Sequence, residues 1–224
     1  MVLNARIMDE RIVDPLIVHL KKNPDTLKIL GTAWDILYVE GRALDVGKRR
    51  ENFFKLLLEK EFGIKVWSAP STERGWDITV VIEGCEKKYS IKTAEGIGTL
   101  KIAWNGFPSI ERARVYRFEA PLLYITRNRS ENKISVSVFD LEDIKRLRDK
   151  LGDNFWWIPR GGTNPRGFGL TGLAVKELIK AAKKKENYIA VEYTPINVET
   201  IAAEYWEGWY HLVKKLALKP YKPK

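Results

Sequence analysis

The chain has 224 residues, of which 45% are hydrophobic, so it can bury a core and disorder is excluded. One Cys and two His residues exclude an internal disulfide and a zinc site built on several Cys or His ligands, but metals held by Asp and Glu oxygens remain possible. The formal net charge of +10 favours a polyanionic partner such as nucleic acid, the alternative being an ordinary basic surface.

The length fits one domain with additions. No stretch approaches the roughly 18 uninterrupted apolar residues of a membrane span. Residues 1–11 carry several charges and no apolar signal-peptide core, so we expect a cytoplasmic protein. Gln is absent and Lys and Glu are common, which leans towards a thermophilic source.

The first third of the chain predicts helices. Apolar segments at residues 16–20 and 32–39 belong to a partly helical N-terminal region. Asp45 can cap a helix that runs to about Phe62, where Gly63 ends it. The apolar residues of this helix recur at helical spacing and must face a core: Phe53, Phe54, Leu57, Leu58 and Phe62.

Strands and further helices follow. The expected strands are residues 64–67, 76–83, 87–93, 114–118, 122–126, 134–139 and 188–193. The expected helices are residues 141–151, residues 171–185 and a long helix from Asn197 that ends at Pro220, and residues 155–169 look irregular. This order predicts a mixed α/β fold with a central, mostly antiparallel sheet flanked by helices.

Residues 76–83 and 87–93 read as a hairpin that concentrates polar groups at one end. With Gly84-Cys85 as a type II′ turn, Asp77 lies opposite Lys92 and Thr79 opposite Ser90. These four side chains then share one face. The opposite face is apolar and consists of Ile78, Val80, Ile82, Tyr89 and Ile91. A carboxylate and an ammonium so placed can hold a divalent metal and stabilise charge on a phosphate, although such a pair is more often a surface salt bridge.

The helix before the hairpin supplies Glu51 as a second carboxylate, beside Lys48, Arg49 and Arg50. Three cations near a helix N-terminus interact unfavourably with the helix macrodipole, so their presence there favours nearby phosphates whose negative charge would offset this interaction. The alternative for Glu51 is a solvated residue paired with Lys55.

This arrangement resembles the PD-(D/E)XK nucleases, and within them the type II restriction endonucleases. Asp77 matches the acid of the first strand, Ser90-Ile91-Lys92 matches the acid-x-lysine of the second, and Glu51 matches the helical glutamate. The sequence departs from the motif with Trp76 in place of Pro and Ser90 in place of the second acid. The resemblance implies a restriction-endonuclease-like fold and Mg²⁺ held by Asp77, Glu51 and the carbonyl of Ile91, with Ser90 in the catalytic set and Lys92 assisting the attacking water. The missing carboxylate would come from Glu51, Glu73, Glu95 or Glu111.

The resemblance further implies a homodimer that cuts sequence-specific duplex DNA without a nucleotide cofactor. Residues 1–224 would form one nuclease domain, with a catalytic core at about residues 45–140 and a helical, DNA-reading part at about residues 141–224. The alternatives are a resolvase-like, structure-specific repair nuclease and a non-catalytic DNA-binding protein. The expected DNA contacts are Lys48, Arg49, Arg50 and Arg74, together with Arg160 and Arg166 of a Gly/Arg loop at residues 159–169.

Overall fold

The computed structural model describes residues 13–39, 46–70, 75–103, 106–160 and 166–196, together with positions 204, 207, 208, 210, 211 and 214. Three helices come first: α1 (Pro15–Lys22), α2 (Asp25–Val39) and α3 (Val46–Phe62). Asp14 caps α1 because its Oδ1 accepts a hydrogen bond from the Leu16 amide at 3.0 Å. The chain leaves α3 through Gly63, whose φ of +62° suits the left-handed end of a helix. The expected helix after Asp45 is thus confirmed.

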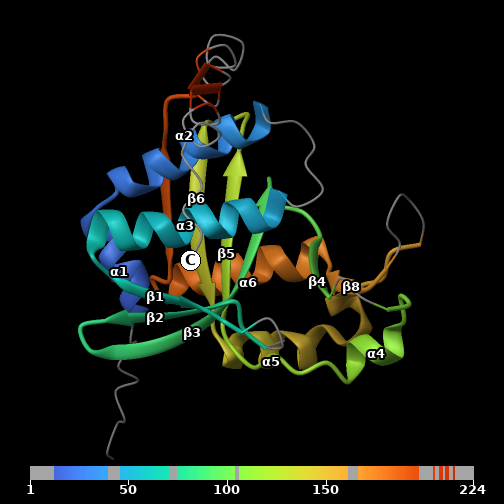
Figure 1. Cartoon of the computed structure of the whole chain (residues 1–224). Helices are drawn as coiled ribbons and strands as arrows, with labels where there is room; N and C mark the ends of the chain where they lie inside the picture. The colour runs from blue at the N-terminus through green and yellow to red at the C-terminus, as the bar shows by residue number, and fades with distance from the viewer. Residues whose placement is uncertain are drawn as a thin grey trace, which may run out of the picture.

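A six-stranded sheet forms the centre of the molecule, in the order β1-β2-β3-β5-β6-β9 (Figure 1). Its strands are β1 (Lys65–Ser68), β2 (Ile78–Ile82), β3 (Cys85–Glu95), β5 (Leu122–Asn128), β6 (Lys133–Phe139) and β9 (Tyr188–Glu192). Neighbouring strands are antiparallel except β3 and β5, which are parallel. The sheet is therefore mixed, and the predicted mixed α/β class is confirmed.

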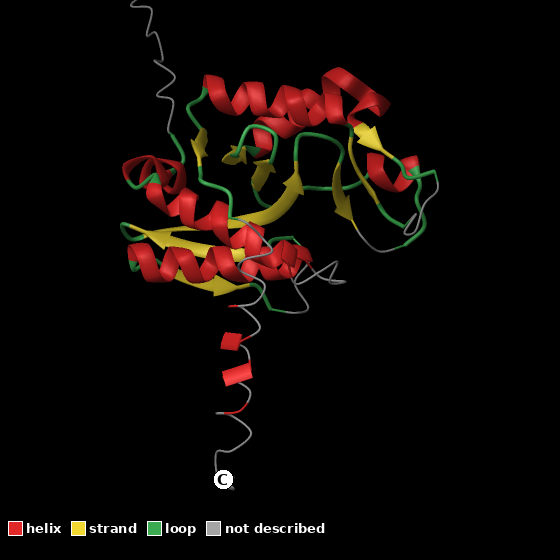
Figure 2. Ribbon diagram, turned by 90° about the horizontal axis from the view of Figure 1, so that it is seen from above, coloured by secondary structure: helices red, strands yellow, loops and turns green. Residues whose placement is uncertain are grey.

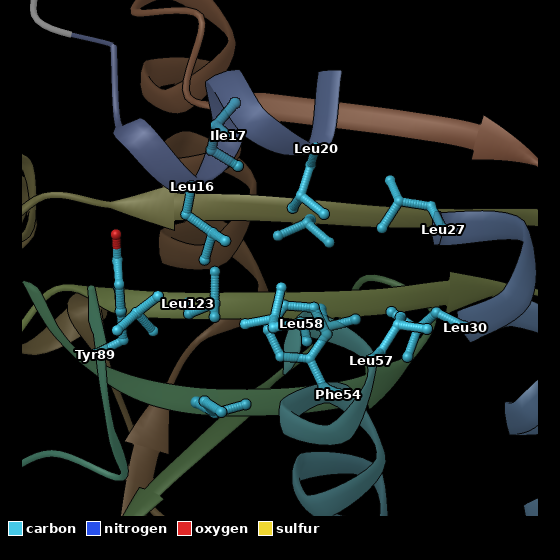
Figure 3. Close-up of a cluster of buried hydrophobic side chains, with 14 of the residues drawn as sticks. Leu16, Ile17, Leu20, Leu27, Leu30, Phe54, Leu57, Leu58, Tyr89 and Leu123 are labelled. Atoms are coloured by element: carbon cyan, nitrogen blue, oxygen red, sulfur yellow. The ribbon is translucent and has the colours of Figure 1, made fainter. Parts of the chain in front are cut away.

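Helices cover both faces of this sheet (Figure 2). On one side, α1 and α2 lie against β6 and β9, while α3 lies against β1 and β3, and their leucines and Phe54 form one apolar cluster with the buried face of the β2–β3 hairpin (Figure 3). On the other side, α5 (Leu141–Leu151) and α6 (Gly172–Lys184) enclose a second apolar cluster with Leu122, Tyr124 and Phe139. The two layers fix the sheet in place, so the polar groups at its open end are held on a rigid support.

A smaller sheet, β4-β8-β7, lies beside the main one with the short helix α4 (Figure 1, right). Its elements are β4 (Leu100–Ala103), α4 (Ile110–Arg114), the 3₁₀ helix η1 (Gly152–Phe155), β7 (Trp156–Trp157) and β8 (Phe168–Leu170). The expected strand at residues 114–118 is wrong, since Arg114 ends α4 and residues 115–118 follow it without regular structure. The alternation of aromatic residues that suggested a strand has another cause: Tyr116 packs on the ring of Phe168, and Phe118 packs on the ring of Trp156. Residues 155–169 also contain two strands instead of being wholly irregular.

The turn of the β2–β3 hairpin lies one residue earlier than expected. Ile82 pairs with Cys85, so the two loop residues are Glu83 and Gly84, with φ values of +52° and +80°. Positive φ at both positions is typical of a type I′ turn, whose twist suits a hairpin. The pairing on β3 thereby shifts by two residues, which preserves the faces because side chains alternate with a period of two. Ile78, Val80, Ile82, Tyr89 and Ile91 are all buried, as predicted.

The last expected helix, residues 197–220, lies almost wholly outside the described residues. Among the described helices, none is long and apolar enough to cross a membrane.

Candidate active site

Asp77 stands at the open end of the hairpin, just before β2 begins. Its amide donates to the carbonyl of Tyr89 at 2.8 Å, and its carbonyl accepts from the Ala69 amide at 3.0 Å. The carboxylate turns towards β3, where Oδ2 accepts from the Ile91 amide at 2.7 Å and from Ser90 Oγ at 3.0 Å. Within the part of the chain that the structure describes, Asp77 uses only Oδ2 in hydrogen bonds, so Oδ1 is available to another ligand.

Lys92 projects into the same group. Its ammonium lies 2.9 Å from Ser90 Oγ, 3.0 Å from the Ile91 carbonyl oxygen and 3.4 Å from Asp77 Oδ2. The structure therefore brings together the predicted hairpin residues Asp77, Ser90, Ile91 and Lys92. The predicted direct pairing of Asp77 with Lys92 across the strands is wrong, because the shifted register places Asp77 opposite Ser90. The side chain of Lys92 is 16% exposed and that of Asp77 is 30% exposed, so both are partly desolvated yet reachable.

Glu51 approaches from α3. Burial is the main reason that the pKa of its carboxyl group is raised, and the negative charge of Asp77 raises this pKa further. The positive charges of Lys48 and Lys92 lower it in part. Its ion-pair partner is Lys48, at 3.2 Å, and not Lys55 as in the alternative interpretation, because the Lys55 ammonium donates to Ser68 Oγ at 2.5 Å. Glu51 and Asp77 are thus two carboxylates close enough to repel each other, and each has an ammonium partner, Lys48 at 3.2 Å from Glu51 and Lys92 at 3.4 Å from Asp77.

The chemistry of this donor set fits a hard divalent metal ion, since Asp77, Glu51 and the Ile91 carbonyl all offer oxygens. Among the described residues, no group of three or more Asp, Glu, His or Cys side chains could hold a metal. Glu95 does not supply the missing carboxylate, because it is ion-paired with Arg50 and Arg127. Glu111, on α4, accepts a hydrogen bond from Ser109, the N-cap of that helix. Glu73 lies outside the described residues.

Comparisons with known proteins identify a matching fold. No family model and no curated protein matches the chain. A solved structure described as a restriction endonuclease in complex with substrate DNA matches with a TM-score of 0.56 and 23% identity, over 86% of this chain and 94% of that one. The chain has the fold of that endonuclease. The predicted restriction-endonuclease-like architecture is confirmed at the level of fold.

Three further residues border the site and were missed from the sequence. Lys55 follows Glu51 by one helical turn, and its pKa is lowered by burial and by Lys48, while Glu51 and Asp77 are among the charges that raise it. Burial and then the charge of Asp77 raise the pKa of Tyr116. Glu119 lies so close to Gly75 that a Cβ there would meet its carboxylate at 2.1 Å. Tyr116 and Glu119 reach the site because the Ser90 amide donates to the Pro121 carbonyl at 3.0 Å, where β5 joins β3. Only the helical spacing of Lys55 carried a signal in the sequence.

The basic residues expected to contact DNA fall into two groups. Lys48 and Arg49 are exposed at the start of α3, and Arg160 and Arg166 are exposed at the described ends of the Gly/Arg loop. Arg50 is only 8% exposed, with its guanidinium 4.1 Å from the centre of the Trp34 ring and hydrogen-bonded to Glu95. We therefore assign Arg50 to the core, against the prediction. Arg74 and residues 161–165 lie outside the described residues.

Proposed function

We propose that the chain is a Mg²⁺-dependent type II restriction endonuclease, which hydrolyses phosphodiester bonds in sequence-specific duplex DNA. The convergence of Asp77, Ser90 and Lys92 at the open end of one hairpin, with Glu51 beside them, carries this proposal. The similarity of the fold to a restriction endonuclease bound to substrate DNA and the net charge of +10 support it.

Each residue has a distinct part in the proposed reaction. Asp77, Glu51 and the carbonyl of Ile91 would hold Mg²⁺, which when bound lowers the pKa of a water molecule and stabilises charge on the phosphate. Lys92 orients the attacking water and offers a positive charge to the phosphate oxygens. Ser90 accepts a hydrogen bond from Lys92 and donates one to Asp77, so it fixes both groups.

Incubating plasmid DNA with the protein, with and without Mg²⁺, and sequencing the ends tests the proposal. We expect cuts at one short sequence, and cleavage of both strands implies a homodimer acting on a palindrome. A resolvase-like enzyme would prefer branched DNA, and a non-catalytic binder would leave the plasmid intact. We further propose that residues 1–224 act as a single nuclease domain, because both apolar clusters pack on one sheet.

Glu51→Gln is expected to lower cleavage and to weaken the apparent affinity for Mg²⁺. The amide removes one anionic ligand but keeps the size of the side chain. The measurement is cleavage rate across a Mg²⁺ titration, with Glu59→Gln on the exposed side of the same helix as the matched control. An unchanged titration for Glu51→Gln would remove it from the metal site and leave Glu73 as a candidate.

Arg160→Ala and Arg166→Ala are expected to reduce cognate binding far more than nonspecific binding. Arg160 borders a hollow of about 580 Å³ with Trp157 and Asn154, and Arg166 precedes Gly167, whose amide donates to the Gly106 carbonyl at 2.9 Å. Arg166 thus extends from anchored backbone. An arginine that reads guanine through two hydrogen bonds discriminates by roughly 1–3 kcal/mol.

The measurement is binding of cognate and scrambled duplexes across a salt series without Mg²⁺. Lys48→Ala and Arg49→Ala serve as the contrast, since phosphate contacts weaken binding to all sequences alike and reduce the salt slope by about one unit each. Equal weakening of both duplexes by the Arg160 and Arg166 variants would make the loop a backbone clamp.

A further inference from the structure

A hollow of about 370 Å³ lies on the polar face of the hairpin, directly beside the candidate active site. Its lining includes Trp67, Trp76, Thr79, Glu86 and Lys88. The register explains this grouping, because Thr79 pairs with Trp67 on β1 and with Lys88 on β3. These three residues form a row across three strands, on the same face as Asp77 and Ser90.

The row lies two residues along the strands from the Asp77–Ser90 position. Two residues of a strand span about 6.6–6.8 Å. This is comparable with the separation of neighbouring phosphates on one DNA strand. With the cleaved strand running along the β-strands and its scissile phosphate beside Asp77 and Lys92, the next phosphate would lie over the row of Trp67, Thr79 and Lys88.

The lining groups suit a sugar–phosphate unit. Trp67 is 49% exposed and offers an apolar surface to a deoxyribose. The Lys88 ammonium is exposed and lies 3.7 Å from the centre of the Trp76 ring, where it can turn to a phosphate oxygen. The Nε1–H of Trp76 is buried and has no hydrogen-bond partner among the described residues.

We propose that this hollow binds the sugar–phosphate unit next to the scissile phosphate on the cleaved strand. The proposal rests on the proposed nuclease function and adds the contact that positions the strand. Glu86 pairs with Val81, two residues further from Asp77 than Lys88 is. Its carboxylate repels phosphates at the outer end of the hollow and so confines the unit to the end nearest the active site.

The test combines a lysine variant with a neutral DNA linkage. Cognate duplexes, identified from the plasmid ends, carry one methylphosphonate either at the linkage next to the scissile phosphate or at a distant one. Binding is measured without Mg²⁺. Lys88→Ala is expected to weaken binding of unmodified duplex several-fold and to reduce the salt slope by about one unit. The neutral flanking linkage weakens wild-type binding similarly but weakens the Lys88→Ala variant no further.

Three matched variants keep the result interpretable. Lys183→Ala removes an ammonium that also lies over an aromatic ring, 4.5 Å from the centre of Tyr188 on β9, and is expected to change nothing. Glu86→Gln is expected to tighten binding, and Trp67→Phe to keep most of the affinity that Trp67→Ala loses. If Lys88→Ala and the neutral linkage weaken binding independently, or if Glu86→Gln weakens it, the hollow does not hold this phosphate. If the wild-type protein neither binds nor cuts duplex DNA, the proposed function itself fails.

Discussion

Asp77→Ala and Lys92→Ala are each expected to reduce DNA cleavage by roughly 10²–10⁴-fold, the range for loss of a general acid–base or charge-stabilising group, while duplex binding is retained. Among the described residues, Oδ1 of Asp77 makes no hydrogen bond, and the Lys92 ammonium lies 3.0 Å from the Ile91 carbonyl oxygen and 3.4 Å from Asp77 Oδ2. Neither residue is needed to hold DNA. Binding by Asp77→Ala without Mg²⁺ should even tighten, because the substitution removes a negative charge beside the phosphate.

Two conservative variants separate catalysis from structure. Asp77→Asn keeps an oxygen that can accept from the Ile91 amide, so it should fold normally and still fail to cleave. Lys92→Met keeps most of the volume of the buried stem without the charge. Lys133→Met on β6, where the lysine is 41% exposed, is the control and should cut at the wild-type rate. Near wild-type cleavage by Lys92→Met would show that the catalytic site has been misassigned.

Arg127→Leu is expected to lower the free energy of unfolding by about 3–5 kcal/mol. Arg127 on β5 is fully buried. Its guanidinium donates to Asp35 on α2, and it contacts Glu95 on β3 through two hydrogen bonds of 2.9 and 3.0 Å. Removal of the cation leaves the carboxylate of Asp35, which is 5% exposed, in the core without its ion-pair partner.

Chemical denaturation of the wild type and the variant measures this effect, with the exposed Arg129→Leu two residues later as the control. The double variant Arg127→Leu and Asp35→Leu should recover part of the lost stability, because replacing both members of a buried ion pair with apolar residues is often neutral. A loss below about 1 kcal/mol for Arg127→Leu, typical of an exposed ion pair, would show that the network is solvated in solution.

Local patterns predicted the elements that carry most of the candidate site. The predicted helix ending at Phe62 matches α3, and the alternation of apolar and polar residues correctly separated the buried face of the hairpin from the face of Asp77 and Lys92. The turn was misplaced because Glu83 adopts a positive φ, which a glycine-based rule does not anticipate.

Non-local pairing is the part that the sequence did not reveal. Nothing in the alternation of β3 indicates that Ser90 lies beside Leu122 in a parallel pair, and this pairing is what brings Tyr116 and Glu119 to the site. The burial of Arg50 was equally hidden. Its neighbours Lys48 and Arg49 are exposed on the same helical turn, and only the docking of Trp34 and Glu95 distinguishes it.

The parallel pairing of β3 with β5 also sets an order in which the molecule can fold. The β2–β3 hairpin is local, and such hairpins form in about 1–10 μs. The other edge of β3 can pair with β5 only after the segment between them, which contains β4 and α4, has brought the two strands together. Non-local pairings of this kind slow folding. The hydrogen bonds among Asp77, Ser90 and Lys92 are contained in the hairpin. We therefore expect the candidate site to assemble early, and the residues around it to pack against it in the slow step.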